Sequence, residues 1–132
     1  MENSRFKFRA WEKTSKEMVY DVQNVSRKRI IGESACESFQ EVIESWEYEI
    51  MQYTGLKDKN GREIYEGDIV EQELLGNVPL DFGSFIGVVK FIDGTYMIEN
   101  AEGTFGVELF SETNPNEAIG NIFENPELLE EK

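Results

Sequence analysis

The acidic residues most able to do chemistry together lie between residues 55 and 70, in the stretch GLKDKNGREIYEGDIV. Carboxylates are the oxygen ligands that hard cations such as Mg²⁺ prefer in proteins. The candidate ligands are Asp58, Glu63, Glu66 and Asp68. One hypothesis for this chain is therefore a carboxylate-based, metal-dependent enzyme such as a phosphodiesterase.

The segment that begins at Asp58 has the composition of an EF-hand calcium loop but not its spacing. An EF-hand loop needs a glycine at its sixth position and a glutamate at its twelfth. Counted from Asp58, the glycine is the fourth residue and the twelfth is Ile69. Calcium binding of the EF-hand type is therefore excluded.

The same stretch is also typical of two consecutive turns. Asn60-Gly61 is a preferred hairpin dipeptide, because both residue types tolerate left-handed backbone angles. This turn would fold Leu56 back towards Ile64 and Tyr65. In the structural interpretation, the turns of this stretch set the direction in which the next predicted strand, 68–75, begins.

Two further turns are predicted on the same chemical grounds. Residues 66–68, Glu-Gly-Asp, reverse the chain around Gly67, and the Asp68 carboxylate can accept hydrogen bonds from nearby backbone N–H groups. Asp93-Gly94 predicts a tight two-residue hairpin turn, because both positions can adopt positive φ. These turns are structural sites, and they carry no catalytic group.

Composition excludes most familiar catalytic groups. The chain has 132 residues, no histidine and one cysteine, Cys36. Ser-His-Asp and Cys-His catalysis, histidine zinc sites and iron–sulfur clusters are thereby excluded. Neither a GxxxxGK[ST] motif nor a GxGxxG motif after a strand is present, so no nucleotide-phosphate loop is expected. We predict that the chain needs no cofactor and is not an enzyme.

The chain is expected to be cytoplasmic. It is 39% hydrophobic, enough for a core, yet no apolar run approaches the roughly 20 residues that span a bilayer. The N-terminal residues MENSRFKFRAW lack the apolar stretch of a signal peptide. A single cysteine agrees with a reducing compartment.

Charge is distributed unevenly along the chain. There are 27 acidic and 13 basic residues, a formal net charge of −14. Residues 1–29 carry eight bases, whereas Lys90 is the only base between Glu63 and Glu131. An acidic surface keeps a protein soluble and repels phosphates, so nucleic-acid binding by the C-terminal part is disfavoured. A sharper interpretation is a negative face that binds a basic protein or imitates nucleic acid.

Apolar and basic residues alternate in residues 5–11, RFKFRAW. Period-two alternation predicts a half-buried strand whose basic face is exposed, and residues 5–23 together predict a β-hairpin. The alternative is a nucleic-acid contact through this strand. Its candidates are Arg5, Lys7, Arg9 and Trp11, with basic groups on phosphates and the indole stacked on a base.

The remaining pattern predicts a mainly β fold. We expect a short helix near residues 37–44, capped by Ser34 or Ser38, and then a strand from 46 to 54. Further strands are predicted at 68–75, 85–92, 95–100, 104–110 and 119–124, with a last helical turn capped by Asn125. Five short strands must curl to bury a core.

The expected fold class is thus a small SH3-like barrel with an N-terminal β-hairpin and a short helix. Residues 1–54 would form the hairpin, helix and a strand packed on the barrel. Residues 55–132 would form the barrel and its C-terminal helical turn. The loop at 76–84 carries no motif, and we attach no function to it.

Three blocks resemble the YopX family, small proteins of phages and prophages in low-GC Gram-positive bacteria. They are MQYTGLKDKNGREIYEGDIV at 51–70, FKFRAWEKTSKEMVYDV near the start and AIGNIFENPELLE near the end. The resemblance follows nearly the whole chain in order. It implies a mainly β protein with an SH3-like barrel, and it supplies no catalytic residues.

The leading functional hypothesis is a non-enzymatic adaptor, encoded by a phage or prophage, whose acidic surface binds a basic host or phage protein. Neither a membrane nor nucleic acid is expected as a partner. We also predict a small homo-oligomer. The aromatic residues of the N-terminal hairpin need a packing partner, because two strands alone are marginal, and a second barrel could supply it. These residues are Phe6, Phe8, Trp11 and Tyr20.

Overall fold

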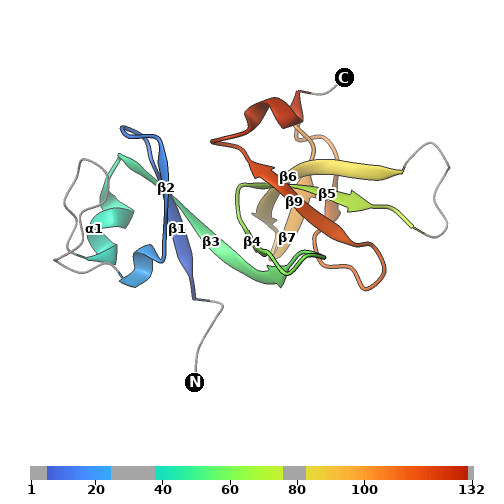
Figure 1. The fold of residues 1–132 in the computed structure, drawn as a ribbon, viewed down its shortest axis with the longest axis horizontal. Coiled ribbons are helices and arrows are strands. Elements are labelled where there is room, and N and C mark those ends of the chain that lie inside the picture. Colours follow the sequence, from blue (N-terminus) through green and yellow to red (C-terminus); the bar gives the residue numbers. More distant parts are fainter. Residues whose placement is uncertain (1–5, 25–37, 76–82, 131–132) are drawn as a thin grey trace. The chain divides into compact units, whose positions relative to one another are not determined.

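The computed structural model describes residues 6–24, 38–75 and 83–130. The chain forms two compact units, Met1–Tyr53 and Thr54–Lys132. Each unit has its own cluster of buried apolar side chains. The strands of each unit and its short helical segments can be followed in Figure 1.

The N-terminal unit is built on three antiparallel strands. They are β1 (Phe8–Glu12), β2 (Glu17–Tyr20) and the first part of β3 (Tyr48–Lys57), in the order β2-β1-β3. The predicted hairpin is β1 and β2, and Glu12 closes its turn, because its Oε1 accepts a hydrogen bond from the Ser15 N–H at 2.6 Å. A 3₁₀ turn, η1 (Val22–Asn24), follows.

A short helix, α1 (Phe39–Glu44), begins where the sequence predicts a cap. Ser38 is the N-cap residue, and its hydroxyl accepts a hydrogen bond from the Glu41 N–H at 3.2 Å. Val42 is the helix residue that is fully buried, and it joins Ala10, Val22 and Tyr48 in the core of this unit. The other predicted cap, Ser34, lies outside the described residues.

The predicted exposed basic face of the first strand is wrong at Arg9. Arg9 is only 3% exposed, since it lies on the central strand β1 and its guanidinium carbon is 6.0 Å from the centre of the Tyr20 ring. Lys7 lies over the ring of Tyr53 in the same way, at 5.5 Å. Long basic side chains pack their apolar stems on such rings. The alternation of residues 5–11 therefore does not separate a solvent-exposed face from a buried one.

The second unit begins in the last part of β3, which forms a hairpin with β4 (Glu63–Tyr65). The loop between them is closed by a hydrogen bond from the Asp58 N–H to the Arg62 carbonyl at 2.8 Å. As predicted, this turn brings Leu56 against the cluster that contains Ile64.

A curled, antiparallel sheet of five strands forms the rest of this unit. The strands are β5 (Asp68–Glu73), β6 (Ser84–Ile92), β7 (Thr95–Glu99), β8 (Gly106–Glu108) and β9 (Asn116–Asn121). Their order is β8-β7-β6-β5-β9, a meander whose last strand returns to the first. This is the arrangement of a small SH3-like barrel, so the predicted fold class is confirmed (Figure 1). We refer to residues Thr54–Lys132 as the barrel unit.

The core of the barrel unit follows from the alternation of its strands. Its main cluster of buried apolar residues is Ile64, Val70, Val89, Ile98 and Leu109. Strand pairing brings these residues together, since Val89 lies opposite Ile98, and Ile98 lies opposite Val107, which is partly buried against the cluster. Burial of branched apolar side chains at these positions stabilises the barrel at about 25 cal/mol per Å² of area removed from water.

The two edge strands of the sheet, β8 and β9, are joined by side-chain amides. The Gln72 Nε2 group donates to the Glu108 carbonyl at 3.1 Å and to Asn116 Oδ1 at 2.9 Å. The Asn116 Nδ2 group donates to the Leu109 carbonyl at 2.9 Å. Gln72 is almost fully buried, so these bonds close the barrel where backbone pairing stops.

The predicted boundaries of the last strand were wrong. The strand was expected at 119–124 but runs from Asn116 to Asn121, because Asn116 and Glu117 pair with β5. Residues 122–124 form a turn, in which the Asn121 Oδ1 accepts hydrogen bonds from the Phe123 and Glu124 N–H groups. A polar loop composition concealed a strand whose register is set by its partner.

The C-terminal turn is present as a 3₁₀ helix, η2 (Pro126–Leu129), with Pro126 at its first turn. Asn125 is its N-cap residue, but the predicted capping hydrogen bond is absent. The Asn125 Oδ1 accepts instead from the Asn121 N–H at 3.2 Å. The side chain therefore anchors the turn that follows β9 rather than the helix.

The turn glycines behave largely as predicted. Asp93 and Gly94 have φ angles of 52° and 85°, which confirms the tight hairpin turn between β6 and β7. Gly67 has φ of 87°. At Asn60-Gly61 the prediction was half right, because Gly61 has φ of 85° while Asn60 is not among the described residues with positive φ.

Several predictions fall on residues outside the described ranges. They concern Arg5, the alternative cap Ser34 and most of the loop at 76–84, of which Gly83 and Ser84 are described. Within the described part of the chain, no helix combines the length and the apolar character needed to cross a membrane.

Candidate functional site

The stretch 55–70, which suggested the metal hypothesis, has a structural role in the barrel unit. The loop 58–62 lies along β9 and forms hydrogen bonds with backbone groups at the edge of that strand. The Asp58 Oδ2 accepts from the Ala118 N–H at 2.9 Å, the Arg62 guanidinium donates to the Ala118 carbonyl at 2.7 Å, and the Lys59 N–H donates to the Asn116 carbonyl at 2.9 Å. An exposed strand edge is a liability that proteins cover, and this loop covers it.

Asp58 has its acceptor capacity taken up by backbone donors. Besides Ala118, the N–H groups of Asn60 and Arg62 donate to its Oδ1, both at 2.9 Å. Burial alone would raise the pKa of Asp58, but the three backbone N–H donors and the Arg62 guanidinium outweigh it and lower the pKa below its usual value. The carboxylate is held ionised for structure.

The other predicted cation ligands do not join Asp58 in a site. The Asp68 Oδ2 accepts from the Tyr65 N–H at 2.8 Å and so closes the turn around Gly67. The Glu63 carboxylate lies 3.4 Å from the Tyr65 hydroxyl. Among the described residues there is no group of three or more acidic, histidine or cysteine side chains that could hold a metal ion. The geometry therefore gives the metal hypothesis no site.

The basic N-terminal strand does not present the arrangement that the nucleic-acid alternative requires. Lys7 and Arg9 lie over aromatic rings of their own unit, and Arg9 is buried. Trp11 is half-buried on the same strand. Arg5 lies outside the described residues. The three described side chains, Lys7, Arg9 and Trp11, do not form an exposed row that could follow a phosphate backbone.

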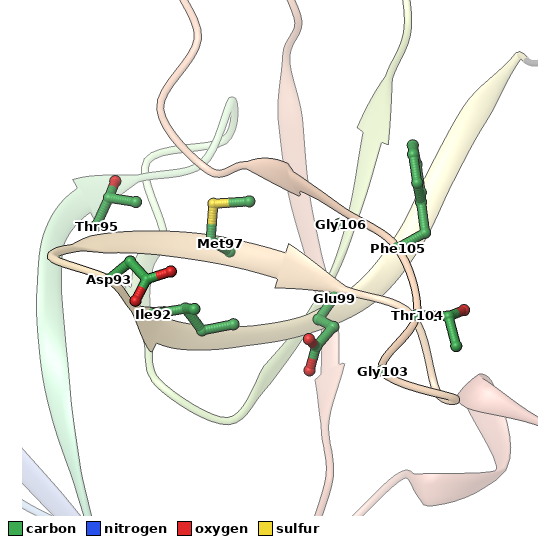
Figure 2. Close-up of a pocket in the computed structure, with 9 residues that line it drawn as sticks. All are labelled: Ile92, Asp93, Thr95, Met97, Glu99, Gly103, Thr104, Phe105 and Gly106. Atoms are coloured by element: carbon green, nitrogen blue, oxygen red, sulfur yellow. The ribbon is translucent and has the colours of Figure 1, made fainter.

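Within the described part of the chain, a groove on the β6–β7 hairpin is a candidate for binding. It has a volume of about 260 Å³ and lies between the hairpin turn and the segment 103–106. Figure 2 shows its lining residues, with the hairpin tip at one end and the 103–106 segment at the other. These residues are Ile92, Asp93, Thr95, Met97, Glu99, Gly103, Thr104, Phe105 and Gly106. We call this feature the hairpin groove.

Strand alternation explains why these side chains share one face. Ile98 points into the core, so Thr95, Met97 and Glu99 point to the opposite face of β7. The register places Thr95 opposite Ile92 and Glu99 opposite Gly106. The floor of the hairpin groove is therefore the outer face of β7.

The wall formed by residues 103–106 is held in place by one asparagine. Asn100 Oδ1 accepts from the N–H groups of Thr104 at 3.0 Å and Phe105 at 3.2 Å, and the Asn100 N–H donates to the Phe105 carbonyl at 2.9 Å. Phe105 is nevertheless 60% exposed, with its ring in edge contact with Phe85. An aromatic side chain held in water by an ordered loop is typical of binding surfaces.

The groove carries its own ion pair. The Lys90 Nζ lies 2.7 Å from Glu99 Oε1, and Lys90 is opposite Met97 in the ladder. Gly103 lies beside the Glu99 carboxylate, since a Cβ at Gly103 would be 3.8 Å from Glu99 Oε1. Asp93 is exposed at the hairpin tip. The groove thus combines an apolar centre with a carboxylate at each end.

The arrangement of an apolar centre and two separated carboxylates is suited to binding. Sequence reasoning identified Asp93 and Gly94 as a turn but missed Met97, Glu99 and Phe105. The sequence did contain one signal for this site. Lys90 is the only base between Glu63 and Glu131, and the carboxylate that it pairs with, Glu99, lines the groove.

Comparisons with known proteins agree on one family. A family profile described as YopX protein matches residues 7–130. The crystal structure of protein EF1440 from Enterococcus faecalis is 30% identical, with a TM-score of 0.57, and the match covers 93% of this chain and 96% of that chain. No functionally curated protein matches this chain.

A second solved structure shows the same fold. The X-ray structure of protein yopX from Bacillus subtilis is 20% identical to this chain, with a TM-score of 0.58. The match covers 95% of this chain and 98% of that chain. At this identity the likeness shows the fold alone.

Proposed function

The chain belongs to the YopX family, and we propose that it is a non-enzymatic adaptor encoded by a phage or prophage. The resemblance to this family supplies no catalytic residues. In this proposal the acidic surface of the barrel unit binds a basic host or phage protein in the cytoplasm. Small barrels support many functions, so the argument has to come from the surface and not from the fold.

The observation that carries the proposal is the hairpin groove. It offers an exposed aromatic ring on an ordered wall, an apolar floor at Met97 and carboxylates at both ends. Exposed aromatic residues and methionine are enriched in protein interfaces. Complementary charge around them speeds association and selects partners.

The function is tested by capture from a lysate of the host at low and at high salt. A charge-driven partner should be retained at low salt and lost as salt screens the carboxylates. The wild-type protein is compared with a Phe105→Ser variant, and a Phe110→Ser variant serves as control, since Phe110 is equally exposed but does not line the groove. The same partner should be lost with the first variant and kept with the second.

The proposal fails if no protein is retained by the wild type at either salt concentration. It also fails if the captured protein binds equally well to both variants at all salt concentrations. The enzyme alternative has no comparable support, because the described carboxylates do not converge on a metal site.

A further inference from the structure

We propose that the hairpin groove takes an extended peptide segment carrying two basic residues four positions apart, with an apolar residue midway between them. This inference rests on the proposed function and names the partner chemistry of the same groove. In it, the Lys90–Glu99 ion pair is an internal competitor that the partner's basic side chain displaces.

The spacing follows from the two carboxylates of the groove. Asp93 is the first residue of the hairpin turn, and Glu99 lies at the far end of β7, which runs from Thr95 to Glu99. Five strand residues span about 13 Å at 3.3 Å per residue. An extended peptide has the same rise, so side chains at its first and fifth positions lie on one face and match the length of β7 from Thr95, next to the hairpin tip, to Glu99.

The middle of the groove selects the middle of the peptide. Met97 lies halfway along β7, between Thr95 and Glu99, and Ile92 lines the same cavity. Methionine adapts its shape to apolar side chains of different size. An apolar residue at the third position of the peptide would therefore rest on Met97.

Lys90 occupies the place that one of the partner's basic side chains would take. Its Nζ lies 2.7 Å from Glu99 Oε1, and Lys90 is the more exposed of the two, at 49% against 20%. Exposed lysine side chains lose little when they leave such a pair. Lys90 can therefore swing into solvent and leave Glu99 to an incoming cation.

Charge favours a basic peptide over the other candidate occupants. Lys90 is the only base between Glu63 and Glu131, so an acidic peptide or nucleic acid would be repelled by this surface. A second copy of this chain carries a net charge of −14, so the acidic barrel unit of that copy would be repelled. These occupants are outcomes that the experiment can reveal.

The test is a titration of the full chain with the peptide GKSVSKG, followed by NMR of the Met97 methyl group. A peptide of identical composition but with adjacent lysines, GSKKVSG, is the spacing control. We expect GKSVSKG to shift the Met97 methyl signal in a saturable way, and GSKKVSG to bind several-fold more weakly.

Three variants test the role of the ion pair. Glu99→Gln should weaken binding of GKSVSKG about two- to fivefold, and Lys90→Met should tighten it by a similar factor, the range expected of one partly exposed ion pair. Lys59→Met is the matched control, because Lys59 pairs with Glu73 and Glu117 on the same unit but outside the groove. It should leave the affinity within about twofold of the wild-type value.

Several results would overturn the inference. The Met97 signal staying unchanged at saturating peptide excludes this groove, and so does equal tightening by Lys90→Met and Lys59→Met. A Met97 shift that grows with protein concentration without peptide assigns the groove to self-association. A partner captured from lysate that leaves Met97 unshifted overturns the groove inference while the proposed adaptor function stands.

Discussion

Asp58 joins two parts of the barrel unit that are far apart in the chain. Its carboxylate receives hydrogen bonds from two N–H groups of its own loop and from Ala118 on β9. The sequence presents this residue as a metal ligand or a turn residue. Its role is decided by Ala118, a partner that is sixty residues away and that local spacing does not reveal.

We expect Asp58→Asn to destabilise the protein by about 1–3 kcal/mol at neutral pH, because an amide cannot accept hydrogen bonds on both sides. Chemical denaturation of the two proteins measures the difference. Asn60→Ser, at an exposed position of the same loop, is a control that should change the free energy of unfolding by less than about 0.5 kcal/mol.

The same pair of proteins gives a pH dependence with a defined sign. The folded protein lowers the pKa of Asp58, so the unfolded chain takes up the proton first as pH falls. The stability that the carboxylate contributes is present above its unfolded pKa of about 3.9 and is lost as pH falls through the folded pKa. The difference between wild type and Asp58→Asn should therefore shrink below about pH 4. A difference that stays constant down to acid unfolding would contradict this account.

Gly87 is required by a close approach of two strands. A Cβ built at this position would lie 2.5 Å from the Glu99 carbonyl oxygen and 2.9 Å from the Ile98 Cγ2. The nearest atom belongs to backbone, which cannot move aside cheaply. We expect Gly87→Ala to cost about 1–3 kcal/mol and to lower the melting temperature of the barrel unit.

The matched control for Gly87 is Gly83, four residues earlier in the chain. A Cβ at Gly83 would meet no atom within 4 Å. Gly83→Ala should therefore be neutral or stabilise slightly, by up to about 1 kcal/mol, because alanine restricts the unfolded chain. Equal destabilisation by the two substitutions would show that the close approach at Gly87 is not the cause.

At the scale of elements, the barrel depends on how its edge strands are closed. The Gln72 amide donates to Glu108 of the β8 edge and to Asn116 of the β9 edge. Gln72→Leu keeps the volume but leaves both acceptors without their donor. We expect a loss of about 1–3 kcal/mol in the free energy of unfolding.

A double-mutant cycle separates this closure from general damage to the core. Asn116→Leu removes the other half of the amide pair, so the combined variant should lose less stability than the sum of the single variants. Additive losses would mean that the two amides act independently and do not close the sheet as a unit.

Elements that have strong local signals were predicted well. Ser38 starts α1, and Asp93-Gly94 forms the β6–β7 turn, because capping and positive φ depend on a few neighbouring residues. The start of β9 was missed, since Asn116 and Glu117 have poor strand propensity and are extended only because β5 pairs with them. Tertiary pairing overrides local preference in such strands.

At the scale of the whole molecule, the carboxylate enzyme hypothesis gives a direct thermal test. A ligand that binds only the folded state must stabilise it. We expect millimolar Mg²⁺ or Mn²⁺ to leave the melting temperature unchanged, with an equal concentration of a monovalent salt at matched ionic strength as control. A rise with either divalent ion that Asp68→Asn abolishes would reopen that hypothesis.

The predicted homo-oligomer stays a prediction, and the structure changes its physical basis. Phe8 was expected to need a second molecule, yet it packs on Phe39 within its own unit at a ring distance of 4.9 Å. Phe6 and Tyr20 remain exposed. Light scattering at high concentration should show a dimer or small oligomer that Phe6→Ser with Tyr20→Ser disrupts. A monomeric wild type at every concentration rules the oligomer out.

The sequence by itself determined the mainly β class, the small barrel and the hairpin turns, and it contains no histidine. These conclusions depend on composition, on alternation and on residues that are neighbours in the chain. Strand period and turn chemistry act over a few residues, so they can be interpreted without knowledge of the fold.

Only the tertiary structure decided which polar residues are structural and which face solvent. Asp58 became a buried anchor because the loop 58–62 lies along β9, and Arg9 became buried because β1 is a central strand. Met97 and Glu99 line the hairpin groove because strand pairing places Lys90 opposite Met97 and Gly106 opposite Glu99. The physical reason is that burial and charge pairing depend on partners brought together by strand register, and that register is a property of the folded sheet.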